Sequence, residues 1–313
     1  MSKVNRRKFI KGAVYSTIAT IPAITVLDSL FIKKENNLTR ITILHTNDLH
    51  SHIDPFPANH SRFPNMGGVS ARYNLIQKIR KEKGKKSVLL FDSGDIMQGT
   101  PYFNYFNGQV EFEAMNKMKY DAATIGNHDF DGGILNLKDR IEQASFPFVI
   151  SNYNFKNTIL NQHTQKFKIF KKRGIKIGVF GIGIELKGLV DKNLYKKTEY
   201  INPIKTANKM AELLKYEEKC NYIICLSHLG FKYKSNKISD LELSKNTKNI
   251  NLILGGHTHT FLNKPYVAEN LENKNTLINQ AGWAGVTLGH LDLFFDKKKK
   301  IKNINFKSNK IKN

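Results

Sequence analysis

Residues able to bind divalent cations recur in five short segments of the chain, and each segment follows an apolar run. They are Asp48 and His50 in TNDLHSH, Asp95 in DSGDIMQG, Asn127, His128 and Asp129 in IGNHDFD, His228 in LSHLG, and His257 and His259 in GGHTHT. Taken singly, a histidine at the end of a strand is usually capped or solvated, and a Gly-Asp pair usually forms a turn. Together, imidazole, carboxylate and amide groups at several strand ends predict a site for divalent metal ions.

The spacing within these segments suggests how the ligands converge. One residue separates Asp48 from His50 and His257 from His259, so each pair would face one side of an extended segment. Two metal ions about 3.5–4 Å apart need a shared ligand, and a carboxylate can bridge them. Asp95 is the natural candidate for that bridge. The glycines in these segments, at 94, 99, 126, 255 and 256, would let the backbone pass close to the ions.

The elements that position these residues can be read from apolar periodicity. Helical spacing predicts helices at 68–82, 109–119, 134–144 and 203–216. Apolar runs predict strands at ITILHTND, SVLLFDSGD, DAATIGNHD, FPFVISN, NYIICLSHLG and INLILGGHTH, a hairpin near 166–183, and two antiparallel strands in TLINQAGWAGVTLGHLDLFFD. This alternation predicts one α/β domain over residues 35–300, with its polar clusters at the carboxyl ends of strands, where sites form in such sheets.

The net charge, the two cysteines and the lysine-rich end of the chain each lead to one expectation. The net charge is +24, but the lysines are dispersed and lack arginine–aromatic interleaving, so a solvated surface is favoured and no nucleic-acid polymer is expected as a partner. Cys220 and Cys225 would lie on opposite faces of a buried strand, too far apart for a disulfide. The Lys-rich segment 301–313 is expected to be a frayed tail.

The first residues have the pattern of an export signal. Residues 1–34 place Arg6 and Arg7 before Lys8-Phe9-Ile10-Lys11 and an apolar run, the order of a twin-arginine signal. We therefore expect export to the periplasm. No clear A-x-A cleavage site follows, so the segment could instead remain as an anchor in the inner membrane, although its apolar stretch is short for a spanning helix. Contact with a membrane is expected only if the signal is uncleaved.

The order of the motifs resembles that of a known family. The series D-x-H, G-D, G-N-H-D, S-H and G-H-T-H is similar to the calcineurin-like metallophosphoesterase superfamily. The segments TILHTNDLHSH, DSGDIMQGTP, TIGNHDFDGG, LSHLG and LILGGHTHT look like its bacterial 5′-nucleotidase branch, and the match covers about residues 41–296. The resemblance implies a four-layer sandwich of two mixed β-sheets flanked by helices.

The resemblance also implies roles for the candidate residues. Asp48, His50 and His259 would hold one divalent ion, Asn127, His228 and His257 the other, and Asp95 would bridge them. His128 matches the catalytic histidine that binds no metal, and Asp129 its orienting partner. Zinc or manganese is the expected metal, with cobalt and iron as alternatives. His52, His60, His163 and His290 match no ligand position.

The implied activity is hydrolysis of phosphate esters by a hydroxide that bridges the two metals. The expected substrates are nucleotides, as for a 5′-nucleotidase or a 2′,3′-cyclic phosphodiesterase. One alternative is a thiosulfohydrolase-like enzyme on the same scaffold, and another is a non-catalytic anion- or envelope-binding module.

Family nucleotidases usually carry a C-terminal domain that recognises the nucleoside, and this sequence ends soon after the catalytic motifs. That domain is therefore expected on a separate chain, with independent action on small phosphate esters or truncation as alternatives. Tyr102, Phe103, Tyr105 and Phe106 could form a docking or substrate face, although ordinary packing explains them as well.

Overall fold

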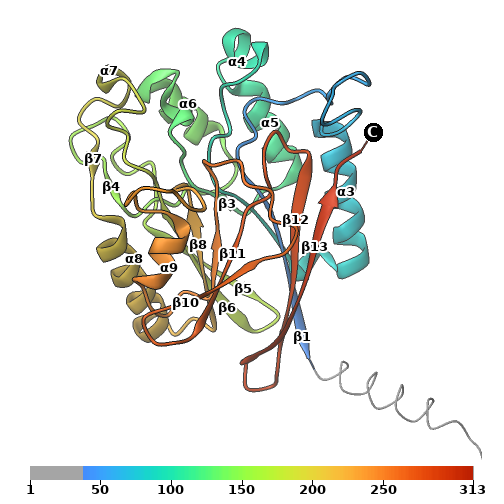
Figure 1. Ribbon diagram of the computed structural model, residues 1–313, viewed down its shortest axis with the longest axis vertical. Helices are drawn as coiled ribbons and strands as arrows, with labels where there is room; N and C mark the ends of the chain where they lie inside the picture. The colour runs from blue at the N-terminus through green and yellow to red at the C-terminus, as the bar shows by residue number, and fades with distance from the viewer. Residues whose placement is uncertain (1–37, 313) are drawn as a thin grey trace, which may run out of the picture. The chain divides into compact units, whose positions relative to one another are not determined.

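Two β-sheets form the centre of the computed structural model, which describes residues 38–312 (Figure 1). The first sheet has the strand order β13-β12-β1-β2-β3. Its members are β1 (Thr39–Thr46), β2 (Val88–Asp92), β3 (Ala122–Ala123), β12 (Thr287–Phe295) and β13 (Ile301–Lys310). β1, β2 and β3 run parallel, whereas β12 and β13 are antiparallel to each other.

The second sheet has six strands in the order β10-β11-β9-β8-β6-β5. Its members are β5 (Phe167–Lys172), β6 (Ile175–Ile182), β8 (Tyr222–Ser227), β9 (Leu252–Leu254), β10 (Tyr266–Glu269) and β11 (Asn275–Asn279). The four inner strands are parallel, and the two edge strands pair antiparallel to their neighbours. β4 (Tyr153–Asn154) and β7 (Glu199–Tyr200) form a separate short ribbon.

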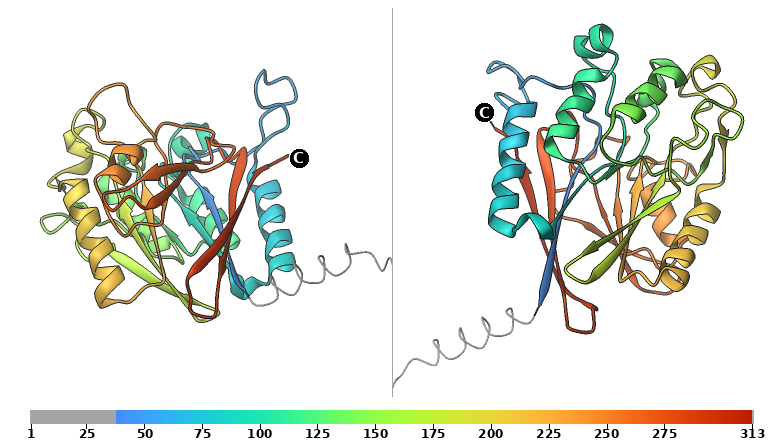
Figure 2. Two further views of the ribbon diagram at one scale, coloured as in Figure 1. Left: turned by 60° about the horizontal axis from the view of Figure 1, so that its bottom comes forward. Right: turned by 180° about the vertical axis from the view of Figure 1, so that it is seen from behind.

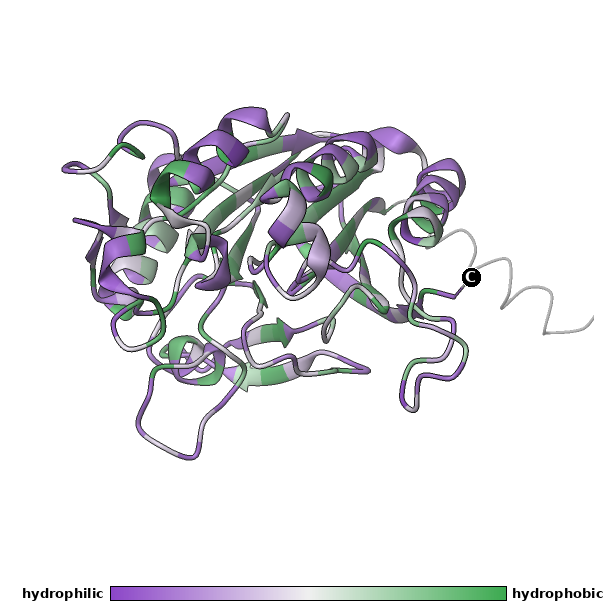
Figure 3. Ribbon diagram, turned by 90° about the horizontal axis from the view of Figure 1, so that it is seen from above, coloured by the Kyte–Doolittle hydropathy of each residue, from purple (hydrophilic) through white to green (hydrophobic). Residues whose placement is uncertain are grey.

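The two sheets stack face to face, and helices cover their outer faces (Figure 2). Alternate residues such as Ile43 and Phe91 of the first sheet and Ile224 of the second share one buried cluster. The outer face of the first sheet packs on α3 (Val69–Lys83), α5 (Gln109–Met118) and α6 (Gly133–Gln143). That of the second packs on α8 (Pro203–Glu212) and α9 (Asp240–Lys245). Hydrophobic strands accordingly lie between more hydrophilic helices and loops (Figure 3). The predicted four-layer sandwich is confirmed.

Local predictions were accurate where apolar periodicity was strong. The helices expected at 68–82, 109–119 and 134–144 correspond to α3, α5 and α6, and the hairpin near 166–183 is the β5–β6 pair. The helix expected at 203–216 begins as α8 and ends in a π-helical turn, Leu213–Glu217. Cys220 and Cys225 are buried free thiols, as predicted.

Two predictions near the C-terminus were wrong. The segment expected to fold as two adjacent antiparallel strands is divided between the sheets, since β11 belongs to the second sheet and β12 to the first. Residues 301–310 are not a frayed tail, because β13 pairs along the whole of β12. Ile304 and Phe306 alternate with Asn303, Asn305 and Lys307, so one face of the strand packs against the core between the sheets. The folded domain therefore extends to the end of the described chain.

Arg40–Asn313 form one compact unit, and the structure describes nearly all of it. The predicted export signal, residues 1–34, lies outside the described residues. Within residues 38–312, no helix has the length and apolar character that crossing a membrane requires.

Candidate active site

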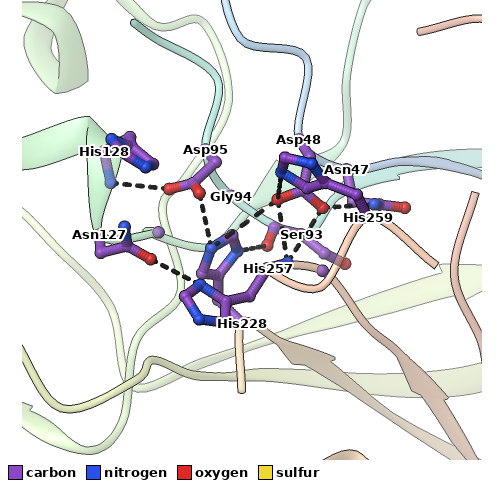
Figure 4. A network of polar contacts seen from close by, with 12 residues as sticks. Asn47, Asp48, Ser93, Gly94, Asp95, Asn127, His128, His228, His257 and His259 are labelled. Atoms are coloured by element: carbon purple, nitrogen blue, oxygen red, sulfur yellow. Dashed lines mark hydrogen bonds and ion pairs between the residues drawn. The ribbon is translucent and has the colours of Figure 1, made fainter. Parts of the chain in front are cut away.

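The loops that follow parallel strands bring all seven predicted ligand residues into one site, and Figure 4 labels six of them, all except His50. The loop after β1 supplies two of them, those after β2, β3 and β8 supply one each, and the loop after β9 supplies two. The first two loops are bonded to each other, because the amide N–H of Asp48 donates to Gly94 and that of His50 donates to Asp95. The carboxyl ends of the parallel strands thus position the site, as expected for this kind of sheet.

Asp48, His50 and His259 form one group of candidate ligands. Their potential ligand atoms all lie within 4.8 Å of one another. The Nε2 atoms of His50 and His259 are 3.1 Å apart, and the Nε2 of His259 lies 3.5 Å from Oδ1 of Asp48. This is a compact nitrogen–oxygen set that can surround one cation.

Asp95, His228 and His257 form the second group, again with ligand atoms within 4.8 Å of one another. Oδ2 of Asp95 lies 3.0 Å from Nε2 of His228 and 3.7 Å from Nε2 of His50, so this carboxylate stands between the two groups. Oδ1 of Asn127 is 2.8 Å from Nδ1 of His257. Asp95 therefore has the geometry that a ligand shared between the two groups would need.

The electrostatics of the site favour a positive charge between the carboxylates. Burial lowers the pKa of His228, but Asp95 and Asp48 outweigh it and raise that pKa to about 10. Burial alone would raise the pKa of Asp95, but the surrounding histidines, led by His228, outweigh burial and hold that pKa well below its usual range. Nε2 of His228 is buried and faces the carboxylate of Asp95 at 3.0 Å. Buried carboxylates and imidazoles that face one another fit divalent metal ions of borderline character.

Several candidate ligands have an unusual backbone conformation. Asp48, His50, Asp95, His257 and His259 all have positive φ angles, between 48° and 71°. Asp48 and His50 do converge, but not because an extended segment turns alternate residues to one side, as the spacing had suggested. Left-handed conformations are uncommon for residues other than glycine and are concentrated at functional sites.

Two glycines allow the close approach of backbone that the sequence suggested. A Cβ atom on Gly126 would lie 2.1 Å from Oδ1 of Asp95, and one on Gly99 would lie 2.8 Å from the carbonyl oxygen of His50. Gly99 also has a φ of +126°, which other residues rarely adopt. Any larger residue at either position would displace a candidate ligand.

His128 lies beside the first group but contacts a different acid from the one predicted. Its ring centroid is 5.2 Å from that of His50, and its amide N–H donates to Oδ1 of Asp95. Its Nδ1 lies 2.7 Å from Oδ2 of Asp131, and this hydrogen bond is the main cause that raises the pKa of His128. The prediction that Asp129 orients His128 was therefore wrong.

Asp129 instead organises the loop that carries Asp95. Its carboxylate accepts hydrogen bonds from the amides of Asp95, Ile96 and Met97 on that loop, and from the amide of Gly126 on its own loop. His128 begins the short helical turn His128–Phe130 and Asp131 follows it three residues later, so helical spacing in HDFD could have identified the pair.

Hydrogen bonds from the second ring nitrogen orient two of the histidines. Nδ1 of His50 contacts the carbonyl of Gln98 at 3.0 Å, and Nδ1 of His228 contacts that of Ser93 at 2.7 Å. Such contacts fix the tautomer and direction of an imidazole ligand. The side chain of Asn47 donates to Asp48 and to the carbonyl of Gly282, which holds the first carboxylate in place.

Four other histidines and the aromatic residues of one short helix are not among the candidate ligands. Among the described residues, His52, His60, His163 and His290 belong to neither ligand group. Tyr102, Phe103, Tyr105 and Phe106 lie on α4 (Pro101–Phe106), a short helix with no buried residue, and Tyr105 is 79% exposed.

A two-sheet sandwich whose strand ends gather His, Asp and Asn around a shared carboxylate defines the class of metal-dependent phosphoesterases. The chain belongs to the calcineurin-like phosphoesterase family, whose model it matches over residues 41–261. It is 32% identical over 296 residues to the trifunctional nucleotide phosphoesterase protein YfkN of Bacillus subtilis, covering 84% of this chain and 19% of that protein.

Solved structures agree with this assignment. The 5′-nucleotidase precursor from Thermus thermophilus has a TM-score of 0.79 and 28% identity, covering 88% of this chain and 55% of that one. The sulfate thiohydrolase SoxB of Thermus thermophilus has a TM-score of 0.72 with 17% identity, over 87% of this chain and 56% of the other, and shares the fold. The chain spans only part of these relatives, so their full activities do not transfer directly.

Proposed function

We propose that this phosphoesterase hydrolyses nucleotides at a pair of divalent metal ions. Asp48, His50 and His259 would hold one ion, Asn127, His228 and His257 the other, and Asp95 would contact both. The observation that carries the proposal is the position of Asp95, whose Oδ2 lies within 3.7 Å of an imidazole nitrogen from each ligand group. Zinc or manganese suits this mixed nitrogen and oxygen donor set.

The protein's own residues would orient the substrate and move a proton. A dinuclear site supplies an activated water and neutralises charge on the phosphoryl oxygens. His128 would donate a proton to the leaving oxygen, since Asp131 holds its Nδ1 and raises its pKa, which favours the protonated form. Asp129 would keep Asp95 in register with the loop after β3 through its four amide hydrogen bonds.

The nucleotide assignment rests on the relatives. YfkN is by name a nucleotide phosphoesterase, and the Thermus thermophilus protein is by name a 5′-nucleotidase. The likeness to the sulfate thiohydrolase is at 17% identity and supports the shared scaffold alone. Complete ligand groups also favour an enzyme over a non-catalytic binding module.

Two further proposals concern where and with what the enzyme acts. Residues 1–34 would direct it through twin-arginine export to the periplasm. A separate chain would supply a nucleoside-binding domain; the match to the Thermus thermophilus nucleotidase covers 55% of that protein and is compatible with this proposal. Recovery of this chain alone from a pull-down of envelope extract would count against such a partner.

A substrate panel tests the proposal. The metal-free protein would be given manganese or zinc and assayed with AMP, 2′,3′-cyclic AMP, p-nitrophenyl phosphate, its bis ester and a sulfur ester. We expect metal-dependent release of phosphate or nucleoside product from at least one nucleotide. Turnover of the sulfur ester alone would overturn the nucleotide assignment, and an absence of turnover with both metals bound would favour the binding module.

A further inference from the structure

His259 is held differently from the other candidate ligand histidines. The second ring nitrogens of His50 and His228 contact backbone carbonyls, whereas His257 contacts Asn127, a candidate ligand of the same ion. Among residues 38–312, no protein atom makes such a hydrogen bond with the second ring nitrogen of His259. Its side chain is also 42% exposed. Because a metal ligand must be oriented by its surroundings, another contact has to fix this ring.

The indole of Trp283 makes that contact. The ring centroids of Trp283 and His259 are 5.9 Å apart, and the rings are nearly parallel, at 23°. The ring centroid of the indole also lies 4.8 Å from that of His52 and 5.6 Å from that of Phe56. These rings join Phe63 and Phe261 in an aromatic cluster that is separate from the three main cores. The indole is thus packed against the other rings of this aromatic cluster.

The backbone around Trp283 is bonded to the segment that carries Asp48. The amide of Ala284 donates to the carbonyl oxygen of Asp48 at 2.8 Å. Asn47 accepts a hydrogen bond from the amide of Ala281 and donates one to the carbonyl of Gly282. Trp283 therefore has its backbone fixed to one candidate ligand of the first ion and its ring stacked on another.

We propose that Trp283 is a positioning residue of the metal site, an inference that rests on the proposed function. Its indole holds the imidazole of His259 so that Nε2 faces Asp48 and His50, in place of the carbonyl contacts that hold His50 and His228. An imidazole that donates its electron pair to a cation becomes electron-poor, and such a ring stacks favourably on the electron-rich indole face. The stack therefore favours the metal-bound form of His259.

The experiment measures metal affinity and uses the fact that the chain has one tryptophan. Metal-free protein is titrated with Co²⁺ and followed by calorimetry and by tryptophan fluorescence, which a paramagnetic ion next to His259 should quench in a saturable way. Trp283→Ala should weaken one of the two binding steps by about 10- to 100-fold, the range typical for loss of a residue that orients a ligand. Trp283→Phe should restore most of that affinity.

The matched control is Tyr266→Ala, which removes a half-exposed aromatic ring that has no ring contact with Trp283 or His259. It should leave both metal affinities unchanged, and thermal unfolding checks that each variant is folded. If Trp283→Ala binds both ions as tightly as wild type while KM rises, Trp283 contacts substrate and the inference is overturned. If wild-type protein itself fails to bind two ions, the proposed function fails instead.

Discussion

Replacing Asp131 with asparagine would test how His128 is made into a proton donor. The acid lies 2.7 Å from Nδ1 of His128 and is the principal cause of its raised pKa. Asparagine keeps the size of the side chain but loses its charge. The pKa of His128 should therefore fall, and the alkaline limb of the kcat profile should move to lower pH, because protonated His128 is lost as pH rises through its pKa.

The size of the effect follows from the hydrogen bond and its exposure. A hydrogen bond to a charged group contributes roughly 1.5–3 kcal/mol. The side chains of His128 and Asp131 are 38% and 26% exposed, so screening by water reduces this to about 1 kcal/mol. That loss corresponds to a roughly fivefold fall in kcat at neutral pH. Removal of the proton donor by His128→Ala should cost more, about 100-fold or beyond.

The assay is the pH dependence of kcat with p-nitrophenyl phosphate and with AMP at saturating metal. Asp139→Asn, at an exposed position on α6, is the matched control and should leave the profile unchanged. An Asp131→Asn enzyme with the wild-type alkaline limb would refute the assignment of Asp131. A shift produced only by Asp129→Asn, with metal content retained, would restore the sequence-based prediction.

Three other changes probe the site and the fold. Asp95→Asn should leave the protein folded but remove most turnover and tight binding of metal, measured by elemental analysis after dialysis against chelator; near-normal hydrolysis would rule out a shared ligand. Gly126→Ala should lower kcat by about 100-fold, because the new Cβ would lie only 2.1 Å from Oδ1 of Asp95 and would push that carboxylate out of place. Unchanged kinetics would show that the loop can shift without loss of activity. Burial opposes ionisation of Asp292, but hydrogen bonds led by His290 and Lys83 hold its pKa well below the usual range. Asp292→Asn should therefore lower the free energy of unfolding by about 2 kcal/mol at pH 7, and the difference should shrink as pH falls through the folded pKa of Asp292; equal loss at all pH values would contradict this.

The sequence was most informative where chemistry and periodicity coincide. Imidazole and carboxylate groups recur at the ends of several apolar strands, so Asp48, Asp95 and His228 could be recognised from the sequence. Parallel strands place such ends on one edge, and for this reason the fold and the ligand groups could be predicted together.

The errors came from features that depend on tertiary contacts. The role of Asp129 was assigned from its place next to His128, whereas the fold turns its carboxylate toward four backbone amides. Asp131 reaches the imidazole only because a short helical turn follows Asn127. The strand β13 was missed because its many lysines hid the alternation of Ile304 and Phe306.

The stacking of Trp283 on His259 could not be read from the sequence. The two residues lie on loops after different strands, and the connection from β11 to β12 crosses from one sheet to the other. A pattern of residues within one segment carries no information about such an encounter.

The central claim is that two ions share Asp95, and anomalous diffraction from crystals of the manganese-loaded protein tests it most directly. The account predicts two peaks about 3.5–4 Å apart, one beside His50 and His259 and one beside His228 and His257, with the carboxylate of Asp95 between them. A single peak, or peaks away from these side chains, would contradict it.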